Sequence, residues 1–179
     1  PAGRLDMDST GLLIFTNDGD LVYRLTHPKY EIEREYNVVV DKRLQHEDSH
    51  KLLDGVMLDG VLAKIIALRN LPPSTYQSHE QSRYSAILKE GRNREVRRLF
   101  EAVGRRVVAL RRVRMGSVHL GTLPSGKVRP LSAQELQGLR NLVGLKVTSA
   151  LKRRVTRVTA KNERARLTST PNSRKGISK

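Results

Sequence analysis

A nine-residue segment near the amino terminus, residues 3–11, places the strongest constraint on the fold of this chain. It reads Gly3-Arg4-Leu5-Asp6-Met7-Asp8-Ser9-Thr10-Gly11 and directly precedes the apolar run Leu12-Leu13-Ile14-Phe15. A polar, glycine-bounded turn that leads into an apolar run predicts a loop followed by a buried strand over residues 12–16. Rigid scaffolds hold reactive side chains in loops of this kind. From the residues alone, the carboxylates of Asp6 and Asp8 could serve catalysis or cap the backbone N–H groups of an Asx-rich turn.

The length and composition indicate one folded domain with an appendage. A chain of 179 residues can bury roughly two-thirds of the surface that its unfolded form exposes. It contains no cysteine, which excludes disulfides and thiolate metal sites and agrees with a reducing cytosol. No apolar run approaches the roughly 18 residues of a membrane-spanning helix, and the first residues lack a signal-peptide pattern. We therefore expect a cytoplasmic protein, monomeric and without a membrane partner.

The charge of the chain is strongly positive and unevenly distributed. Its 34 Lys and Arg residues against 18 Asp and Glu residues give a net charge of +16, which favours a polyanionic partner. Residues 146–179 hold eleven basic residues and the single acidic residue Glu163, so they carry +10 and leave +6 for residues 1–145. The tail is poor in aromatic residues and rich in polar ones, which predicts disorder. We expect a catalytic domain over residues 1–145 and a basic, disordered tail over residues 146–179 that contacts RNA, rather than one that only aids solubility.

Hydrophobic periodicity and turn signals predict short helices that alternate with strands. Helices are expected over residues 20–25, 45–54, 93–103 and 131–142, and strands over residues 12–16, 35–40, 61–68, 83–88 and 107–113. Residues 116–127, with three glycines and a proline, predict a hairpin or an extended loop. The chain shows no internal repeat.

Four arginines follow the single glycine Gly91: Arg92, Arg94, Arg97 and Arg98. A second glycine and a Gly-Lys-Ser/Thr ending are missing, so the segment is not a nucleotide phosphate loop. On a helix, Arg94, Arg97 and Arg98 would share one face, where their charges repel unless anions lie between them. This pattern favours phosphate or carboxylate binding over a merely solvated basic face. The five histidines show no ligand spacing for zinc.

Two further segments accompany the one at residues 3–11. One joins His27-Pro28 to Glu33-Arg34-Glu35-Tyr36, and the other runs from Glu90 to Gly104. Together with Thr16-Asn17-Asp18-Gly19, the three segments resemble the bacterial ribosomal RNA pseudouridine synthases, in the branch that modifies single uridines. They occur in the family's order between residue 3 and about residue 116, which makes them far more specific together than singly. The second and third are most similar to the large-subunit enzymes of this branch.

The resemblance implies an α+β catalytic domain, with a mixed, mostly antiparallel sheet, flanking helices and a basic cleft. It implies that uridine is isomerised to pseudouridine at a specific site in ribosomal RNA, with 23S rRNA of the large subunit as the expected substrate, and that no metal or organic cofactor takes part. The family's catalytic domain normally begins with an upstream apolar strand and a Lys-Pro segment, preceded by a small RNA-binding domain. We expect this chain to lack both. A non-catalytic RNA-binding or ribosome-assembly module is the alternative from another functional class.

The resemblance also implies the catalytic residues. Asp6 matches the family's essential aspartate, which acts either as a nucleophile at the ribose C1′ or as a base that removes a ribose proton. Tyr36 matches the tyrosine that stacks on the base and takes part in removing the C5 proton. Arg97 matches the basic residue that pairs with the aspartate. These residue types suit the reaction, because a carboxylate stabilises positive charge on a sugar and a nearby arginine keeps that carboxylate ionised.

The remaining site residues are expected around these three. Arg4 matches the arginine associated with the flipped nucleotide, and Leu110 would form an apolar wall behind the tyrosine. Arg92, Arg94 and Arg98 are expected to bind RNA. A uridine that reacts inside folded RNA must first leave its stack, so these residues should surround one pocket.

Overall fold

The computed structural model describes residues 1–73 and 80–145, and a six-stranded sheet forms its centre. The strands are β1 (Ser9–Gly11), β2 (Arg34–Val40), β5 (Ala67–Leu71), β6 (Ser82–Leu88), β7 (Val107–Met115) and β8 (Val118–His119). The order across the sheet is β1-β7-β2-β6-β5, and β8 pairs with β7. β1 runs parallel to β7, and the other neighbouring strands are antiparallel. The expected mixed, mostly antiparallel sheet is thus confirmed.

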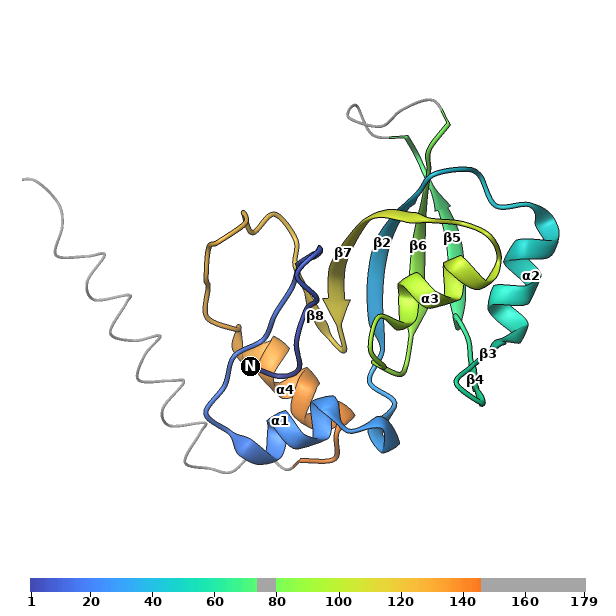
Figure 1. The fold of residues 1–179 in the computed structure, drawn as a ribbon. Coiled ribbons are helices and arrows are strands. Elements are labelled where there is room, and N and C mark those ends of the chain that lie inside the picture. The colour runs from blue at the N-terminus through green and yellow to red at the C-terminus, as the bar shows by residue number, and fades with distance from the viewer. Residues whose placement is uncertain (74–79, 146–179) are drawn as a thin grey trace, which may run out of the picture. The chain divides into compact units, whose positions relative to one another are not determined.

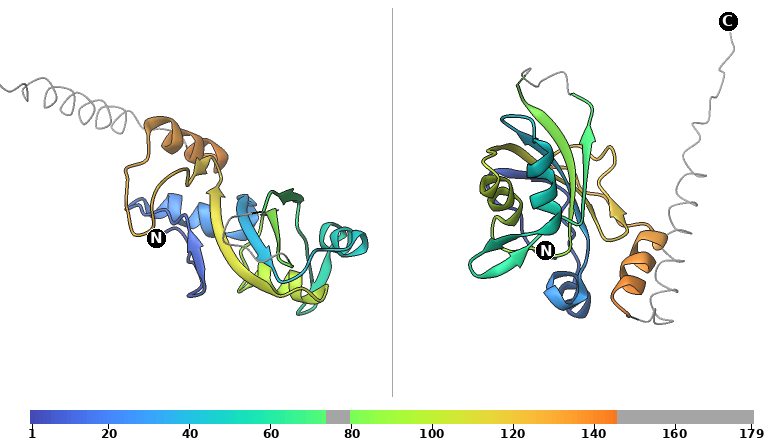
Figure 2. Two further views of the ribbon diagram at one scale, coloured as in Figure 1. Left: turned by 90° about the horizontal axis from the view of Figure 1, so that it is seen from above. Right: turned by 90° about the vertical axis from the view of Figure 1, so that its right-hand side faces the viewer.

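Helices flank this sheet, as Figures 1 and 2 show. They are α1 (Gly19–Thr26), the short 3-10 helix η1 (Pro28–Tyr30), α2 (His46–Asp54), α3 (Glu95–Ala102) and α4 (Ala133–Leu142). A separate two-stranded ribbon joins β3 (Val56–Leu58) to β4 (Val61–Ala63). α3 lies across one face of the sheet. α1 and α4 lie near each other, away from α3 (Figure 1). The helices and strands together confirm the α+β class.

Two hydrophobic clusters hold the domain together, and β7 contributes to both. The first packs α2 and α3 against the sheet and includes Phe100, which is completely buried, and Leu110 of β7. The second joins α1, α4 and the amino-terminal segment, and includes Met115 of β7. Because β7 runs from one cluster into the other, side chains along it lie between the two cores.

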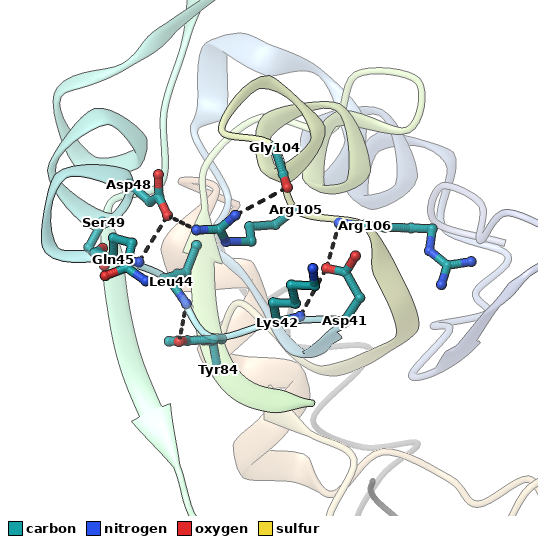
Figure 3. A network of polar contacts seen from close by, with 10 residues as sticks. All are labelled: Asp41, Lys42, Leu44, Gln45, Asp48, Ser49, Tyr84, Gly104, Arg105 and Arg106. Carbon is teal, nitrogen blue, oxygen red and sulfur yellow. Dashed lines mark hydrogen bonds and ion pairs between the residues drawn. The ribbon is translucent and has the colours of Figure 1, made fainter. Parts of the chain in front are cut away.

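The first cluster is closed at one edge by polar contacts, drawn in Figure 3. Asp48 on α2 accepts a hydrogen bond from Arg105 Nη2 at 2.6 Å. The backbone N–H of Arg106 donates to Asp41 at 3.0 Å. The Tyr84 hydroxyl accepts the N–H of Leu44 at 3.0 Å. These contacts tie the segment after β2 to the turn that follows α3.

The predicted strand over residues 12–16 is wrong. The sheet strand is β1, which ends at Gly11, and residues 12–16 continue the chain after it outside the sheet. Leu12 and Ile14 are nevertheless buried, because their side chains pack in the second cluster. The Leu12 N–H donates to the Arg112 carbonyl and the Ala2 N–H donates to the Ile14 carbonyl, which holds the backbone of this segment in place. The apolar pattern of residues 12–16 therefore predicted correctly that Leu12 and Ile14 are buried. It did not show that the segment is a strand, because side chains can be buried without strand hydrogen bonds.

One further strand differs from the prediction, and the predicted hairpin agrees with it. The predicted strand over residues 61–68 is divided between β4, which belongs to the ribbon, and β5 of the main sheet. The hairpin predicted at residues 116–127 is confirmed, because β8 forms a short antiparallel hairpin with β7. No helix in the described part of the chain is long and apolar enough to cross a membrane. The tail at residues 146–179 lies outside the described residues, so the domain boundary before it stays a prediction.

Candidate active site

A cavity of about 290 Å³ opens beside β2 and β7. Its walls come from the loop at residues 2–9, from Thr26, from β2, from residues 88–96 and from β7. Six of the predicted site residues line it: Arg4, Asp6, Tyr36, Arg92, Arg94 and Leu110. Side chains from segments far apart in the sequence are thus brought to one place.

Strand register explains why Tyr36 and Leu110 share this cavity. Tyr36 of β2 lies opposite Arg112 of β7, and Leu110 lies opposite Val38. Residues directly opposite each other in a sheet project to the same face, as do residues two apart along a strand. The pairing shifts between Glu35 and Tyr36, where a bulge occurs. Tyr36, Leu110 and Arg112 therefore form one side-chain row on the cavity face.

The loop that carries Asp6 is held close to β7. Its turn is closed by a hydrogen bond from the Ser9 N–H to the Asp6 carbonyl at 3.0 Å. Gly11 has a φ of +111°, and a Cβ there would lie 2.1 Å from the Arg112 carbonyl oxygen. Only glycine allows this close approach. Among the described residues, the Asp6 carboxylate has no ion pair, so it remains free to meet a substrate.

Arg97 does not pair with Asp6, which differs from the expectation. Its guanidinium is buried, and Nε forms an ion pair with the Asp8 carboxylate at 3.2 Å. Nη2 donates to the Asp8 carbonyl and Nη1 donates to the Val107 carbonyl, both at 2.8 Å. These three contacts engage all three nitrogens of the guanidinium and tie the Asp6 loop to the start of β7. In this structure Arg97 supports the loop from outside the cavity.

The expected common face of Arg94, Arg97 and Arg98 is also wrong. Arg94 precedes α3 with a left-handed φ of +49°, so it is not on the helix. It donates from Nη1 to both oxygens of the Asp8 carboxylate, at 3.2 and 3.3 Å. Arg98 pairs instead with Asp59 of the ribbon turn at 2.7 Å and does not line the cavity. Arg94 and Arg97 thus meet at the Asp8 carboxylate, in agreement with the predicted carboxylate binding, and only Arg98 pairs elsewhere.

The exposed rim of the cavity is basic. Arg4 is exposed, and Arg92 pairs with Glu90 at 2.7 Å while about a third of its side chain remains exposed, at 30%. Arg94 is 43% exposed at the side chain. Guanidiniums in such positions bind phosphates without reading a base.

Three buried ionisable residues of the cavity were missed by the sequence analysis: Arg34, Glu95 and Arg112. Burial raises the pKa of the Glu95 carboxyl, whose oxygen accepts the N–H of Arg92 at 3.3 Å. Arg34 and Arg112 stand two positions from Tyr36 and Leu110, respectively. Residues two apart on a strand project to the same face. A polar residue two positions from a predicted pocket residue is therefore the signal that would have found both arginines.

Comparison with known proteins gives consistent matches. The family model described as RNA pseudouridylate synthase matches residues 1–102. The chain is 45% identical over 145 residues to ribosomal large subunit pseudouridine synthase B of Pseudomonas aeruginosa, covering 80% of this chain and 37% of that protein. It is 41% identical over 143 residues to an uncharacterized RNA pseudouridine synthase of Aquifex aeolicus, covering 79% of this chain and 56% of that protein.

A solved structure agrees with these matches. The crystal structure of a pseudouridylate synthase superimposes with a TM-score of 0.66 at 33% identity, covering 77% of this chain and 58% of that one. The chain thus spans between 37% and 58% of the length of these three proteins.

Proposed function

Because the chain belongs to the RNA pseudouridylate synthase family, we propose that it isomerises uridine to pseudouridine at a specific site in ribosomal RNA. The expected substrate is 23S rRNA, since several relatives carry the name ribosomal large subunit pseudouridine synthase B. The observation that best supports the proposal is the meeting of Asp6, Tyr36 and Leu110 in one cavity with a basic rim.

Asp6 is proposed to act on the ribose. Breaking the N1–C1′ bond builds positive charge on the sugar, and a carboxylate can trap that charge at C1′ or remove a ribose proton. The free carboxylate of Asp6 on the cavity wall suits either route. Arg97 is proposed to support it indirectly, by fixing the loop through Asp8 and Val107.

Tyr36 and Leu110 are proposed to hold the detached uracil. An aromatic ring stacks on a base without fixing its rotation, so the base can turn and present C5 to C1′. Leu110 supplies an apolar surface on the same face of the sheet. Arg4, Arg92 and Arg94 at the rim are proposed to bind phosphates around the flipped nucleotide, and Arg98 is proposed to contact RNA outside the cavity. The proposed chemistry requires no metal or organic cofactor.

The test compares Asp6→Asn with Asp54→Asn, in which the same chemical change falls on an exposed carboxylate at the end of α2. Pseudouridine formation is measured on 23S rRNA, and RNA affinity is measured in parallel. Asp6→Asn should lower the rate by at least about 10²-fold and leave the affinity unchanged, whereas Asp54→Asn should behave as wild type. An RNA-binding module without catalysis would form no pseudouridine in any of the three proteins.

A further inference from the structure

Two buried arginines on the cavity wall lack an acidic partner. Arg34 is 7% exposed and Arg112 is 3% exposed, and both line the cavity. Among the described residues, neither guanidinium has a carboxylate within ion-pair distance. Burial lowers the pKa of Arg34, and the nearby charge of Arg112 acts in the same direction, whereas Tyr36 and the Glu95 carboxylate act against both. Buried cations are costly when no negative charge accompanies them, so this wall is suited to a ligand that supplies one.

Arg112 has a buried terminal nitrogen without a hydrogen-bond partner, whereas both terminal nitrogens of Arg34 donate. The two terminal nitrogens of Arg34 donate to the backbone carbonyls of Leu25, Ile32, Lys89 and Glu90. Arg112 donates from Nε to the Leu12 carbonyl at 2.8 Å and from Nη1 to the Arg4 carbonyl at 3.5 Å. Its Nη2 is buried and has no hydrogen-bond partner. A buried donor without a partner costs about 1–3 kcal/mol.

The position of Arg112 points to the base rather than to a phosphate. Arg112 lies directly opposite Tyr36 across the β2–β7 pair, so a base that stacks on Tyr36 places an edge beside it. The arginines available to phosphates are the more exposed Arg4 and Arg94 at the rim. RNA phosphates remain on the backbone outside the pocket, whereas the flipped base enters most deeply.

We propose that Arg112 is a further catalytic residue, whose Nη2 donates to a carbonyl oxygen of the target uracil and stabilises the negative charge of the detached base. This inference rests on the proposed function. When the N1–C1′ bond breaks, its electron pair stays on uracil and is delocalised onto O2 and O4. Asp6 takes up the positive charge of the sugar, by a bond to C1′ or by removing a ribose proton. The C5–C1′ bond then forms as the Asp6–C1′ bond breaks, or as Asp6 returns the ribose proton. C5 then loses its proton and N1 gains one, so the product is an isomer of uridine, while Arg112 keeps its own proton.

The test uses two RNA substrates with uridine or 5-fluorouridine at the position that the wild-type protein modifies. Fluorine withdraws electrons, so the detached fluorinated base is a more stable anion and depends less on a donor. Arg112→Gln should slow single-turnover consumption of the uridine by about 10²- to 10³-fold, and should slow that of 5-fluorouridine by a clearly smaller factor. The affinity for RNA and its salt dependence should not change. Arg111→Gln, the same change on the exposed neighbouring residue, should leave both rates unaltered.

Arg112→Lys keeps a positive charge and donor groups, and is the variant to use if Arg112→Gln does not fold. Arg112→Lys should lower the rate on uridine by a smaller factor than Arg112→Gln does. The rate on 5-fluorouridine should again fall by less than the rate on uridine. If the rates on both substrates fell by the same factor, the proposal would be overturned, because Arg112 would then only support the loop that carries Asp6. Weaker RNA binding with a log–log salt slope reduced by about 0.7 to 0.9 would assign Arg112 to a phosphate instead. Wild-type protein that modifies neither RNA would refute the proposed function itself, a result distinct from all of these.

Discussion

At the scale of single residues, three buried arginines of the described residues, Arg34, Arg97 and Arg112, bind main-chain carbonyls more than carboxylates. Arg34 joins the end of α1 to the loop before α3, Arg97 joins the Asp6 loop to β7, and Arg112 reaches both ends of that loop. A guanidinium has five donors in a rigid fork, so one side chain can connect two or three segments. The loop that carries Asp6 is therefore held in place largely by hydrogen bonds to its backbone.

Arg97→Ala should destabilise the domain. It leaves the carbonyls of Val107 and Asp8 without their donor, and each buried group left unpaired costs about 1–3 kcal/mol. We expect the free energy of unfolding in urea to fall by about 2–4 kcal/mol, with a loss of pseudouridine formation. Arg98→Ala is the matched control, because its partner Asp59 is 78% exposed and such pairs contribute about 0–1 kcal/mol. Similar losses for the two variants would show that Arg97 does not fix the loop.

At the scale of elements, the shortest strand beside the cavity has the largest consequence for the site. β1 has three residues, yet its parallel pairing with β7 sets the position of the Asp6 loop. The pairing depends on Gly11, where the two backbones approach too closely for a side chain. The site is thus sensitive to a residue that carries no chemistry.

Gly11→Ala should separate β1 from β7. The added methyl group collides with the Arg112 backbone, so we expect the free energy of unfolding to fall by about 3 kcal/mol or more and pseudouridine formation to be lost. Gly121→Ala is the control: Gly121 also has a positive φ, +57°, but nothing lies within 4 Å of its Cβ position. It should cost only the left-handed strain of about 1–2 kcal/mol and keep full activity. Retained activity in Gly11→Ala would contradict the role given to β1.

The local sequence pattern predicted the positions of most helices and strands, but fewer of the contacts between them. Apolar alternation located β2, β6 and β7 because each buries one face in a core. The helix predicted over residues 131–142 is α4, whose start is capped by hydrogen bonds between Ser132 and Glu135. The sequence pattern gave wrong predictions where contacts with distant parts of the chain decide the local structure. Leu12 and Ile14 are buried without a strand ladder, and Arg94 leaves the helix through a left-handed residue.

Contacts between distant segments also explain which site residues the sequence could not predict. Asp6 and Tyr36 were predicted from motifs, but the importance of Arg112 depends on its register opposite Tyr36. No short-range pattern reports which residues face each other across two strands that lie 67 residues or more apart in the chain. The contact of Arg97 with Asp8 instead of Asp6 is likewise a matter of tertiary geometry.

At the scale of the whole molecule, the net charge of +16 should govern RNA affinity more than RNA choice. The cavity holds the groups that would recognise a base, and the remaining charge is spread over the chain. Most of the surplus, +10, belongs to residues 146–179.

Deleting residues 146–179 should weaken RNA binding most at low salt and flatten the log–log salt dependence, by about 0.7 to 0.9 for each phosphate that the tail neutralises. The same uridine should still be modified, because the tail contributes charge without base recognition. A control protein with the tail sequence scrambled at constant composition should bind as wild type does. Loss of target choice after deletion, or after scrambling, would show that the tail reads its RNA. Binding isotherms across a salt series and a pseudouridine map of the RNA provide the two measurements.

The dependence of the Asp6 loop on main-chain contacts has a consequence for protein engineering. Arg97 and Arg112 hold the loop chiefly by the carbonyl oxygens of Arg4, Asp8 and Leu12, which every amino acid possesses. The side chains of Arg4 and Asp6 make no contact on which the loop's shape depends among the described residues. Other side chains can therefore replace Arg4 and Asp6 while the backbone stays in place, so new functional groups can be installed at this edge of the cavity.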